Sequence, residues 1–583
     1  MKRKLFGPPG TGKTTILVRS VVKLMTREKD PIAPESICFI THTNKGKKEI
    51  WHKMSERYEK VTGRYLHIDQ ETPGFESFRT IHGLCSYTIK NSDNFNMAKP
   101  KDFKTWYNTE HDPDYFIETF GESYKENEMV KFYSYMRSRQ MDFDEAYLIS
   151  KERTLNREAY RRKDVLKYYL DSWLAYKLKN NLYEFIDQLL KGKEKNNFND
   201  YRVLVIDEAQ DSSKLQWEIA DLIRDRHSLD YQIFAGDDDQ AIFNFSGGDE
   251  QEFLNRYGNE FKTKILRTSY RLSQENIELA NIVSRQYIKK RQNKEFSARS
   301  RRAKSSPPER TDNIDRIPLE KGSWTIQCAV KRILTVDIAP EIQKKGLWYK
   351  KHVHVGGTND VQESYHVNAE LLRAVRFYLK MQKGKKVGFD ELSSYRGLTG
   401  KSILESNPLF SKQSVGELDT KKDQIANNKQ YDKDFIVKKF GLNFNQPLID
   451  HFDTHISKAK SKSLKWRTEY HPNKTDLDCR EYIERCLKNS QDLLSEPKIK
   501  LSTIHAMKGG EDDNIVVIED MGTAFFNQFT KGTPQNKDEV TRMFYTGITR
   551  VKEKLFILSL GTGSAFPFKE IFSELNKKFK KVA

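Results

Sequence analysis

Cysteine is scarce in this sequence, with five residues among 583. They are scattered at Cys38, Cys85, Cys328, Cys479 and Cys486, and no two of them form a C-x-x-C pair. The scarcity argues against a disulfide framework, and the scatter argues against a cysteine zinc site. We therefore expect a reducing compartment and predict a cytoplasmic protein.

Long apolar runs are missing as well. No segment approaches the ~20 residues that a membrane-spanning helix requires, so no membrane partner is expected. The N-terminus is basic, but it runs directly into the stretch LFGPPGTGKTT at residues 5–15. That stretch leaves no room for the apolar region of a secretory signal peptide.

Acidic residues are in deficit: 82 Asp and Glu stand against 101 Lys and Arg, which gives a net charge of +19. A charge of this sign favours polyanionic partners, and nucleic acid is the first to consider. A basic protein without such a partner is the alternative at this point. Aromatic residues make up 12% of the chain, which is enough to supply stacking surfaces for bases as well as apolar cores.

The first feature that is present is a phosphate-binding loop. Gly7, Gly12, Lys13 and Thr14 match the pattern G-x-x-x-x-G-K-[ST]. In such loops the glycines let backbone N–H groups turn toward a phosphate, the lysine contacts the β and γ phosphates, and the hydroxyl binds Mg²⁺. The apolar run that follows predicts a helix whose N-terminus faces the phosphates. The residues predicted to contact the nucleotide are Gly7, Pro8, Pro9, Gly10, Thr11, Gly12, Lys13, Thr14 and Thr15.

Apolar strands that end in polar residues are predicted at 36–44, 201–211 and 231–240. Such strands, with helices between them, are typical of a parallel α/β sheet whose site lies along the carboxyl edge. The full pattern is that of two α/β halves, each interrupted by an insertion. The predicted boundaries are 1–94 with 197–262 for the first half, 95–196 for a mainly helical insertion, 263–375 with 496–583 for the second half, and 376–495 for the second insertion.

A basic stretch at 289–310 shows almost no apolar periodicity and contains Ser and Pro. This composition predicts a mobile loop or linker, with phosphate binding as the alternative.

Carboxylates at strand ends complete a pattern suited to phosphoryl transfer. Asp207 and Glu208 directly follow one strand, and we assign Asp207 to Mg²⁺ and Glu208 to the attacking water. Gln240 follows the GDDD turn and suits a sensor of the γ-phosphate. Arg271 and Arg550 come from the second half and are predicted to stabilise transition-state charge, although a solvated surface position is the alternative for each. The predicted cofactors are ATP and Mg²⁺.

Eight blocks occur in a fixed order along the chain: GPPGTGKT, ITHTNKGKKE, TIHGL, VIDEAQD, AGDDDQAIFNFSGGD, RTSYRLSQENIELA, LSTIHAMKGGE and RMFYTGITRVKEKL. In this order they resemble the helicase motifs of the UvrD/Rep/PcrA family of superfamily 1. The resemblance implies two RecA-like motor domains with ATP at their interface and single-stranded DNA across the top. It also implies translocation in the 3′→5′ direction.

The resemblance assigns further residues by their position in these blocks. Tyr270 matches the tyrosine that stacks on adenine, and Glu511 matches a carboxylate near the ribose. Phe243 is the less secure of two aromatic matches, because alternate residues of an extended segment face opposite ways and it also suits a core. The residues that match DNA-contacting positions are His42, Asn44, Thr80, His82, Phe243, Phe245, Thr503 and His505.

Several positions depart from the family pattern. Only MKRKLF precedes the loop, where the family has a glutamine-bearing segment that reads adenine. Either the segment is absent or the start of the chain has been lost, and nucleobase discrimination is expected to be weaker than in family members that have the segment. His42 replaces a stacking aromatic residue, Thr15 and Ser246 each replace an arginine, and Gly510 replaces a leucine. These replacements bear on the coupling between ATP and DNA rather than on the reaction. After Arg550 there is room only for a strand and a Lys-rich tail, so no fused nuclease domain is expected.

The sequence thus predicts an ATP-dependent DNA helicase that moves 3′→5′ on single-stranded DNA and unwinds duplex. Two alternatives stay open: an ATP-gated binding switch or protein-displacing translocase with little unwinding, and an RNA-directed motor. The predicted partners are single-stranded DNA, single-strand/duplex junctions, and a nuclease or replication and repair proteins, with a monomer in isolation. The cytoplasm would be bacterial, or that of a host if a phage encodes the chain.

Overall fold

The computed structural model describes most of the chain. The residues outside the description are 67–77, 91–95, 155–157, 227–228, 300–305, 355–360, 366, 389–390, 393, 396–429, 441–443, 457–465, 467–477 and 581–583. Among the residues that are described, no helix combines the length and the apolar character needed to cross a membrane.

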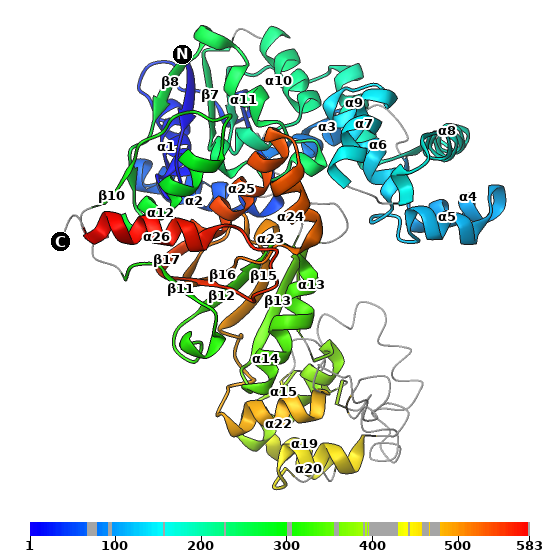
Figure 1. Ribbon diagram of the computed structural model, residues 1–583, viewed down its shortest axis with the longest axis vertical. Coiled ribbons are helices and arrows are strands. Elements are labelled where there is room, and N and C mark those ends of the chain that lie inside the picture. The colour runs from blue at the N-terminus through cyan, green and yellow to red at the C-terminus, as the bar shows by residue number, and fades with distance from the viewer. Residues whose placement is uncertain are drawn as a thin grey trace.

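The first sheet has six parallel strands in the order β3-β2-β6-β7-β1-β8. They are β1 (Lys2–Phe6), β2 (Ile37–Thr41), β3 (Phe78–Thr80), β6 (Val203–Ile206), β7 (Tyr231–Gly236) and β8 (Lys262–Ile265). Helices α1 (Lys13–Met25) and α2 (Asn44–Thr62) cover one face, and α10 (Lys214–Arg226) covers the other (Figure 1). Burial on both faces explains why the central strands are continuously apolar. The predicted α/β class with parallel strands is confirmed.

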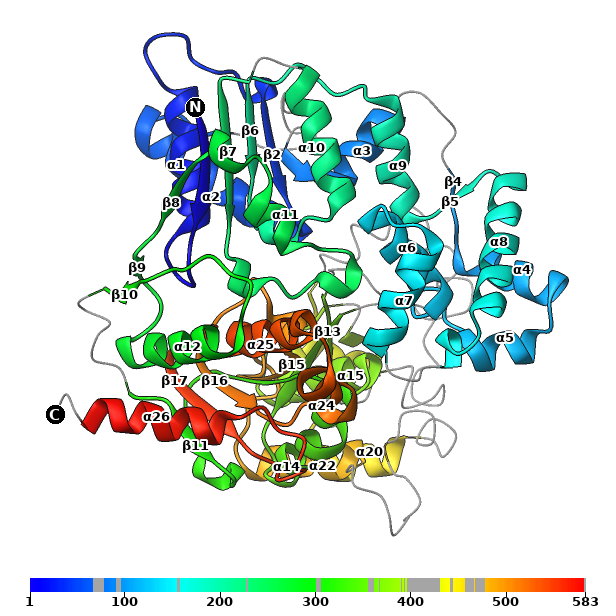
Figure 2. The same ribbon diagram turned by 45° about the horizontal axis from the view of Figure 1, so that its top comes forward.

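The second sheet has seven strands in the order β11-β17-β16-β12-β15-β13-β14, and only β13 and β14 pair antiparallel. They are β11 (Glu309–Thr311), β12 (Trp324–Cys328), β13 (Tyr349–His354), β14 (Val361–Tyr365), β15 (Ile499–Thr503), β16 (Asp512–Ile518) and β17 (Val551–Leu558). Helices α12 (Gln274–Tyr287), α25 (Pro534–Ile548) and α26 (Phe568–Lys580) cover one face, while α14 (Ala339–Lys344) and α15 (Ala369–Gln382) lie on the other (Figure 2).

The chain leaves the first sheet later than predicted. The boundary expected at 262/263 falls inside β8, which pairs in parallel with β1 from Arg3↔Lys262 to Phe6↔Ile265. The sequence KTKI of β8 gives no apolar signal, because this edge strand is largely exposed. We call residues up to Ile265 the first part and residues from Leu266 onward the second part. The boundary expected at 375/376 likewise falls inside a helix, α15.

The stretch 95–196 forms a helical extension of the first part that projects to one side (Figure 1). Its helices are α4 (Pro100–Glu110), α5 (Pro113–Phe120), α6 (Glu128–Arg139), α7 (Phe143–Thr154), α8 (Lys163–Lys179) and α9 (Phe185–Lys195). Aromatic rings fill its centre, with Trp106 and Trp173 fully buried and their ring centroids 5.1 Å apart. This core is continuous with that of the first sheet, so the extension is held firmly beside it.

The second insertion, predicted at 376–495, is described only in pieces. Helices α19 (Lys433–Phe440), α20 (Leu448–His455) and α22 (Cys479–Lys488) lie at the end of the molecule farthest from the first sheet (Figure 1). Their buried residues join the same apolar cluster as α15 and the second sheet. The rest of this predicted insertion is largely outside the described residues.

The basic stretch at 289–310 is not a mobile linker where the structure describes it. Arg291 lies 2.5 Å from a carboxylate oxygen of Asp239, and Lys294 lies 2.8 Å from one of Asp237. Farther along, β10 (Ser297–Ala298) pairs with β9 (Thr268–Ser269). The prediction failed because the segment is held by ion pairs rather than by an apolar face, and apolar periodicity detects only the latter. Residues 300–305 lie outside the description.

All five cysteines are buried free thiols. Burial raises the pKa of the Cys38, Cys85, Cys328 and Cys486 thiols above the ordinary value, because it disfavours the thiolate. All five thiols are free, as the scattered positions of the cysteines in the sequence predicted.

Gly247 provides a test of how closely the extension approaches the first part. Its φ is +99°, and a Cβ at this position would lie 2.3 Å from Cβ of Ser138 on α6. We expect Gly247→Ala to cost about 1–3 kcal/mol for the backbone conformation and about 1–3 kcal/mol more for overpacking. Thermal and urea unfolding measure this loss.

Gly121→Ala is the matched control for this prediction. Gly121 has a similar φ of +93°, but nothing lies within 4 Å of its ideal Cβ. It should therefore show the backbone cost alone. Equal losses in the two variants would mean that the contact between Gly247 and Ser138 is not close in solution.

Candidate functional site

The glycine-rich loop lies between β1 and α1, and its backbone conformation and close contacts require glycine at Gly7, Gly10 and Gly12. Gly10 and Gly12 have φ of +73° and +79°, where a side chain is disfavoured. At Gly7 the restriction is space, because a Cβ would lie 2.1 Å from Cγ of Lys13. The Nζ of Lys13 donates to the carbonyl oxygen of Gly7 at 2.7 Å. The lysine is thus folded over the loop at the N-terminus of α1.

Two adjacent carboxylates follow β6, and they face different partners. The Oγ1 of Thr14 donates to Oδ2 of Asp207 at 2.7 Å, so the hydroxyl and the carboxylate predicted to bind Mg²⁺ are already together. Glu208 has a φ of 54°, which is rare for a residue with a side chain. Its carboxylate accepts instead from Nε2 of Gln210 at 2.7 Å.

The charges around this pair separate the two carboxylates electrostatically. Burial and the neighbouring charge of Glu208 raise the pKa of Asp207. Burial alone would also raise the pKa of Glu208, but the positive charges of Lys13 and Lys508 outweigh it and lower that pKa below the ordinary value. Glu208 is therefore the more firmly ionised of the two.

Residues of the second part close the other side of the site. The Nε2 of Gln240 and the Oγ1 of Thr549 are 3.4 Å apart. Arg271 lies 2.6 Å from a carboxylate oxygen of Glu511. Arg550 is buried, and burial together with the charge of Arg271 lowers its pKa to about 10. Neither arginine is a freely solvated surface residue.

One cavity of ≈ 680 Å³ joins these groups. Pro9 and the loop residues from Gly10 to Thr15 line it, whereas Gly7 and Pro8 do not. The structure therefore gathers residues that the sequence predicts from seven different blocks. Its other lining residues include His42, Asp207, Glu208, Gln240, Phe243, Tyr270, Arg271, His505, Glu511 and Arg550.

Tyr270 is held at the rim of this cavity by the loop itself. Its backbone N–H donates to the carbonyl oxygen of Gly10 at 2.9 Å, and its side chain is half exposed. The guanidinium carbon of Arg299 lies 5.3 Å from the centroid of its ring, within range of a cation–π contact. An aromatic ring in this setting can stack on a planar base.

The two threonine–histidine blocks adopt the same local structure in the two sheets. Thr80 ends β3, and its Oγ1 accepts from the N–H of Gly83 at 3.2 Å at the start of α3 (Ile81–Lys90). Thr503 ends β15, and its Oγ1 accepts from the N–H of Ala506 at 3.2 Å at the start of α23 (Ile504–Met507). His82 and His505 therefore occupy equivalent first-turn positions.

The two phenylalanines after β7 differ in exposure. Phe245 is 54% exposed, and its ring makes an edge contact with His505 at 5.3 Å between centroids. Phe243 is only 5% exposed, and Nζ of Lys508 lies 4.9 Å from its ring centroid. Lys508 covers the ring of Phe243 in this structure, and the predicted contact of Phe243 with a DNA strand stays a prediction.

His42 and Asn44 are the remaining residues predicted to contact DNA. A ring nitrogen of His42 is 3.0 Å from Oγ of Ser212, so the imidazole is tied to the first part at the cavity. Asn44 begins α2, but its side chain lies outside the described residues.

Lys508 is a site residue that the sequence analysis missed. Its Nζ lies 2.7 and 2.6 Å from the two carboxylate oxygens of Asp211 and 2.5 Å from the carbonyl oxygen of Gln240. Lys508 thereby connects the second part to the segments that follow β6 and β7 of the first part. The signal was available, because Lys508 stands within the block LSTIHAMKGGE.

Phe185 is a second missed residue, and no motif would have found it. Its ring stacks on His82 with centroids 3.9 Å apart and planes 13° apart. It begins α9 in the helical extension and is half exposed. Only the fold brings it beside the block around Thr80, more than a hundred positions earlier in the chain.

A family model matches most of the first part of the chain, and two relatives match shorter stretches of the chain. The family model described as UvrD/REP helicase N-terminal domain matches residues 3–262. An ATP-dependent helicase/nuclease subunit of Bacillus velezensis is 30% identical over 86 residues, which are 14% of this chain and 7% of the relative. The protein of the same name from Clostridium acetobutylicum is 30% identical over 107 residues, 17% of this chain and 8% of the relative. The matched stretches thus span less than a tenth of these relatives.

The imidazoles of His42 and His82 are predicted to stay neutral at pH 6. Burial and the charge of Lys508 lower the pKa of His42 to about 4, and burial and His42 lower that of His82 to about 3. Because unfolded histidine titrates near ~6.5, unfolding takes up protons below that pH, and these groups cost stability progressively as pH falls toward the folded values. NMR titration of ¹³C-labelled histidine measures both pKa values.

Phe185→Ala should raise the pKa of His82 toward the ordinary value, because it uncovers the ring. Leu178→Ala, at a site 86% exposed in the same extension, is the control and should leave it unchanged. A His82 that titrates near ~6.5 in the unaltered protein would contradict the stacked arrangement.

Proposed function

We propose, on the premise that this chain is a member of the UvrD/REP helicase family, that it is an ATP-dependent helicase which translocates 3′→5′ on single-stranded DNA. Its two sheets would form two RecA-like motor domains. The observation that carries the proposal is the single cavity lined by the phosphate loop of the first part and by Arg271, Glu511 and Arg550 of the second.

The donor set at the loop fits Mg²⁺. The hydroxyl of Thr14 and the carboxylate of Asp207 are hard oxygen ligands that lie 2.7 Å apart, and such ligands suit a small divalent cation. Bound there, the ion would supply positive charge to the β and γ phosphates. Thr14 and Asp207 would hold it, and ATP would exchange the contact of Lys13 with Gly7 for contacts with its phosphates.

Each remaining group has a role in hydrolysis. Glu208, ionised and hydrogen-bonded to Gln210, would orient and deprotonate the attacking water. Arg271 and Arg550 would stabilise negative charge on the transferring group from the opposite side of the cavity. Gln240 would sense the γ-phosphate, since its side chain already contacts Thr549 of the second part. Tyr270 would stack on adenine and Glu511 would lie near the ribose.

Contacts to DNA would lie along the surface next to this cavity. The equivalent blocks around Thr80 and Thr503 would each hold a stretch of backbone, and the exposed rings of Phe245 and Phe185 would stack on bases. Phe245 follows Gln240 by five residues in the sequence, so one loop would connect the γ-phosphate to a base. Closure of the cavity by ATP and its reopening after hydrolysis would move these contacts along the strand.

Strand-displacement and ATPase assays with single-stranded DNA, single-stranded RNA and duplex test this function. Stimulation by single-stranded DNA with unwinding of a 3′-tailed duplex is the expected result. ATPase without unwinding would favour a switch or protein-displacing translocase, and stimulation by RNA alone would favour an RNA-directed motor.

A nuclease partner is a further part of the proposal. Two relatives are named as subunits of an ATP-dependent helicase/nuclease, which describes those proteins as components of an assembly. We propose that this chain is a monomer in isolation and joins such a partner on DNA. Co-purification with a nuclease, followed by size-exclusion chromatography with and without DNA, would examine this.

Glu208→Gln should retain binding of ATP and Mg²⁺ but hydrolyse ATP slowly, because an amide cannot take a proton from water. General-base groups typically contribute about 10²–10⁴-fold. Single-turnover hydrolysis measures the rate, and binding of a fluorescent ATP analogue measures affinity. Lys13→Ala is the comparison and should lose hydrolysis together with phosphate contacts while keeping nucleotide-free DNA binding. Loss of ATP binding in Glu208→Gln would refute the division of roles between Asp207 and Glu208.

Phe245→Ala should keep substantial ATPase at saturating DNA but lose most strand displacement. One stacked base is worth about 1–3 kcal/mol, so binding to a long strand survives while a contact that is gripped in each cycle is lost. The measured quantity is base pairs opened per ATP consumed, with thermal unfolding in parallel. Phe243→Leu, at the buried neighbouring ring, is the comparison for altered packing. An unchanged ratio in Phe245→Ala would rule out this contact.

A further inference from the structure

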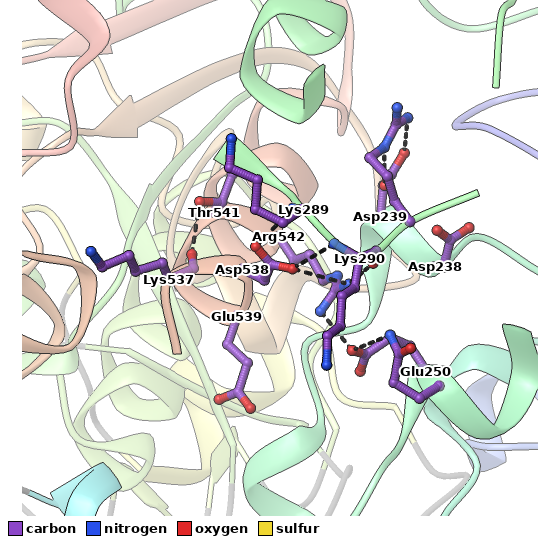
Figure 3. Close-up of polar contacts among 12 residues, drawn as sticks. Asp238, Asp239, Glu250, Lys289, Lys290, Lys537, Asp538, Glu539, Thr541 and Arg542 are labelled. Carbon is purple, nitrogen blue, oxygen red and sulfur yellow. Dashed lines mark hydrogen bonds and ion pairs between the residues drawn. The ribbon is translucent and has the colours of Figure 1, made fainter. Parts of the chain in front are cut away.

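Residues 289–294, which we call the strap, connect the two parts at a buried point beside the cavity. The strap follows α12, and its first residues bind α25 (Figure 3). The carboxylate of Asp538 accepts from the N–H groups of Lys289 and Lys290 at 2.9 and 3.0 Å. The guanidinium of Arg542 donates to the carbonyl oxygen of Lys290 at 2.6 Å. The start of the strap is thus fixed to the second part.

The rest of the strap binds the acidic turn Asp237–Asp239 of the first part. Arg291 makes a two-pronged contact with Asp239 at 2.8 and 2.5 Å. The N–H of Gln292 donates to Oδ2 of Asp238 at 2.8 Å. Lys294 is the centre, because its Nζ forms ion pairs with all three carboxylates of the turn.

A third contact joins α25 to the first part directly. The guanidinium of Arg542 lies 2.9 Å from a carboxylate oxygen of Glu250, and both side chains are essentially inaccessible to solvent. Lys294 and the three aspartates are equally inaccessible. Buried charges of this kind hold a narrow geometry, because a displaced partner leaves an uncompensated charge away from water.

Both ends of this network lead straight to residues that face the cavity. The acidic turn is followed at once by Gln240, and α25 is followed by Thr549 and then by Arg550, of which Gln240 and Arg550 line the cavity. Gln240 and Thr549 are only 3.4 Å apart. The strap therefore holds the turn after β7, in the first part, next to the C-terminal end of α25, in the second part.

We propose that Lys294, Arg291 and Arg542 are positioning residues for ATP hydrolysis, which set the register of Gln240 against Arg550. The inference rests on the proposed function. Lys508 also joins the two parts across the cavity, through its contact with Asp211 at 2.6 Å.

The test compares two double variants that remove the same kind of contact in different places. Lys294→Met with Asp238→Asn removes one positive and one negative charge from the strap and keeps its net charge. Arg310→Met with Glu519→Gln does the same to an ion pair with a 2.5 Å contact inside the second part. For each protein we would measure the thermal midpoint, and kcat and KM for ATP hydrolysis at saturating single-stranded DNA.

The strap variant should lose about 10- to 100-fold in kcat, the scale expected for a small misplacement of reacting groups, with KM nearly unchanged. The control should lose a similar amount of thermal stability and keep its kcat. Lys294→Arg, which retains the charge, should recover part of the rate. Equal kcat losses in the strap variant and the control would overturn the positioning role.

Arg291→Gln covers the case in which the buried double variant does not fold. Its side chain is 10% exposed at the edge of the strap, and its loss should lower kcat in the same direction by a smaller factor. An unchanged kcat in this variant would overturn the proposal. Failure of the proposed function is a separate result: the unaltered protein would then show no ATP hydrolysis stimulated by nucleic acid.

Discussion

Parallel strands point their carboxyl ends in one direction, and the site depends on this constraint. In the first sheet the phosphate loop follows β1, Asp207 follows β6 and Gln240 follows β7, so all reach one edge. Thr503 ends β15 of the second sheet at the corresponding edge. Each functional group needs only a turn or a helix start to reach its place, since the sheet has already brought the strand ends together.

The fold class and most of the cavity were accessible from the sequence because their signals are local. Apolar strands that end in polar residues marked β2, β6 and β7, and the glycine spacing marked the loop. The edge strand β8 was missed because it is exposed and carries no apolar run. Phe185 was missed because its proximity to His82 is created only by the helical extension.

The remaining differences between the predictions and the structure come from contacts of charged side chains. The basic stretch from residue 289 was predicted to be a linker because it lacks apolar periodicity. In the structure, buried aspartates form ion pairs with its charged side chains. Phe243 was matched to a DNA-contacting position with a core position as the alternative, and Lys508 covers its ring. In both places a lysine or arginine reaches across from the second part to groups of the first. A partner distant in the sequence decides such burial, and no local pattern reveals it.

The burial of all five thiols has a practical consequence for following motion in this molecule. A thiol is reactive as the exposed thiolate, and these side chains offer neither exposure nor, in the four with a raised pKa, ready ionisation. A cysteine introduced on the surface of each part would then react well ahead of the native ones. Maleimide dyes or spin labels could be attached without first replacing the native cysteines. The separation of the two parts could then be followed through a catalytic cycle.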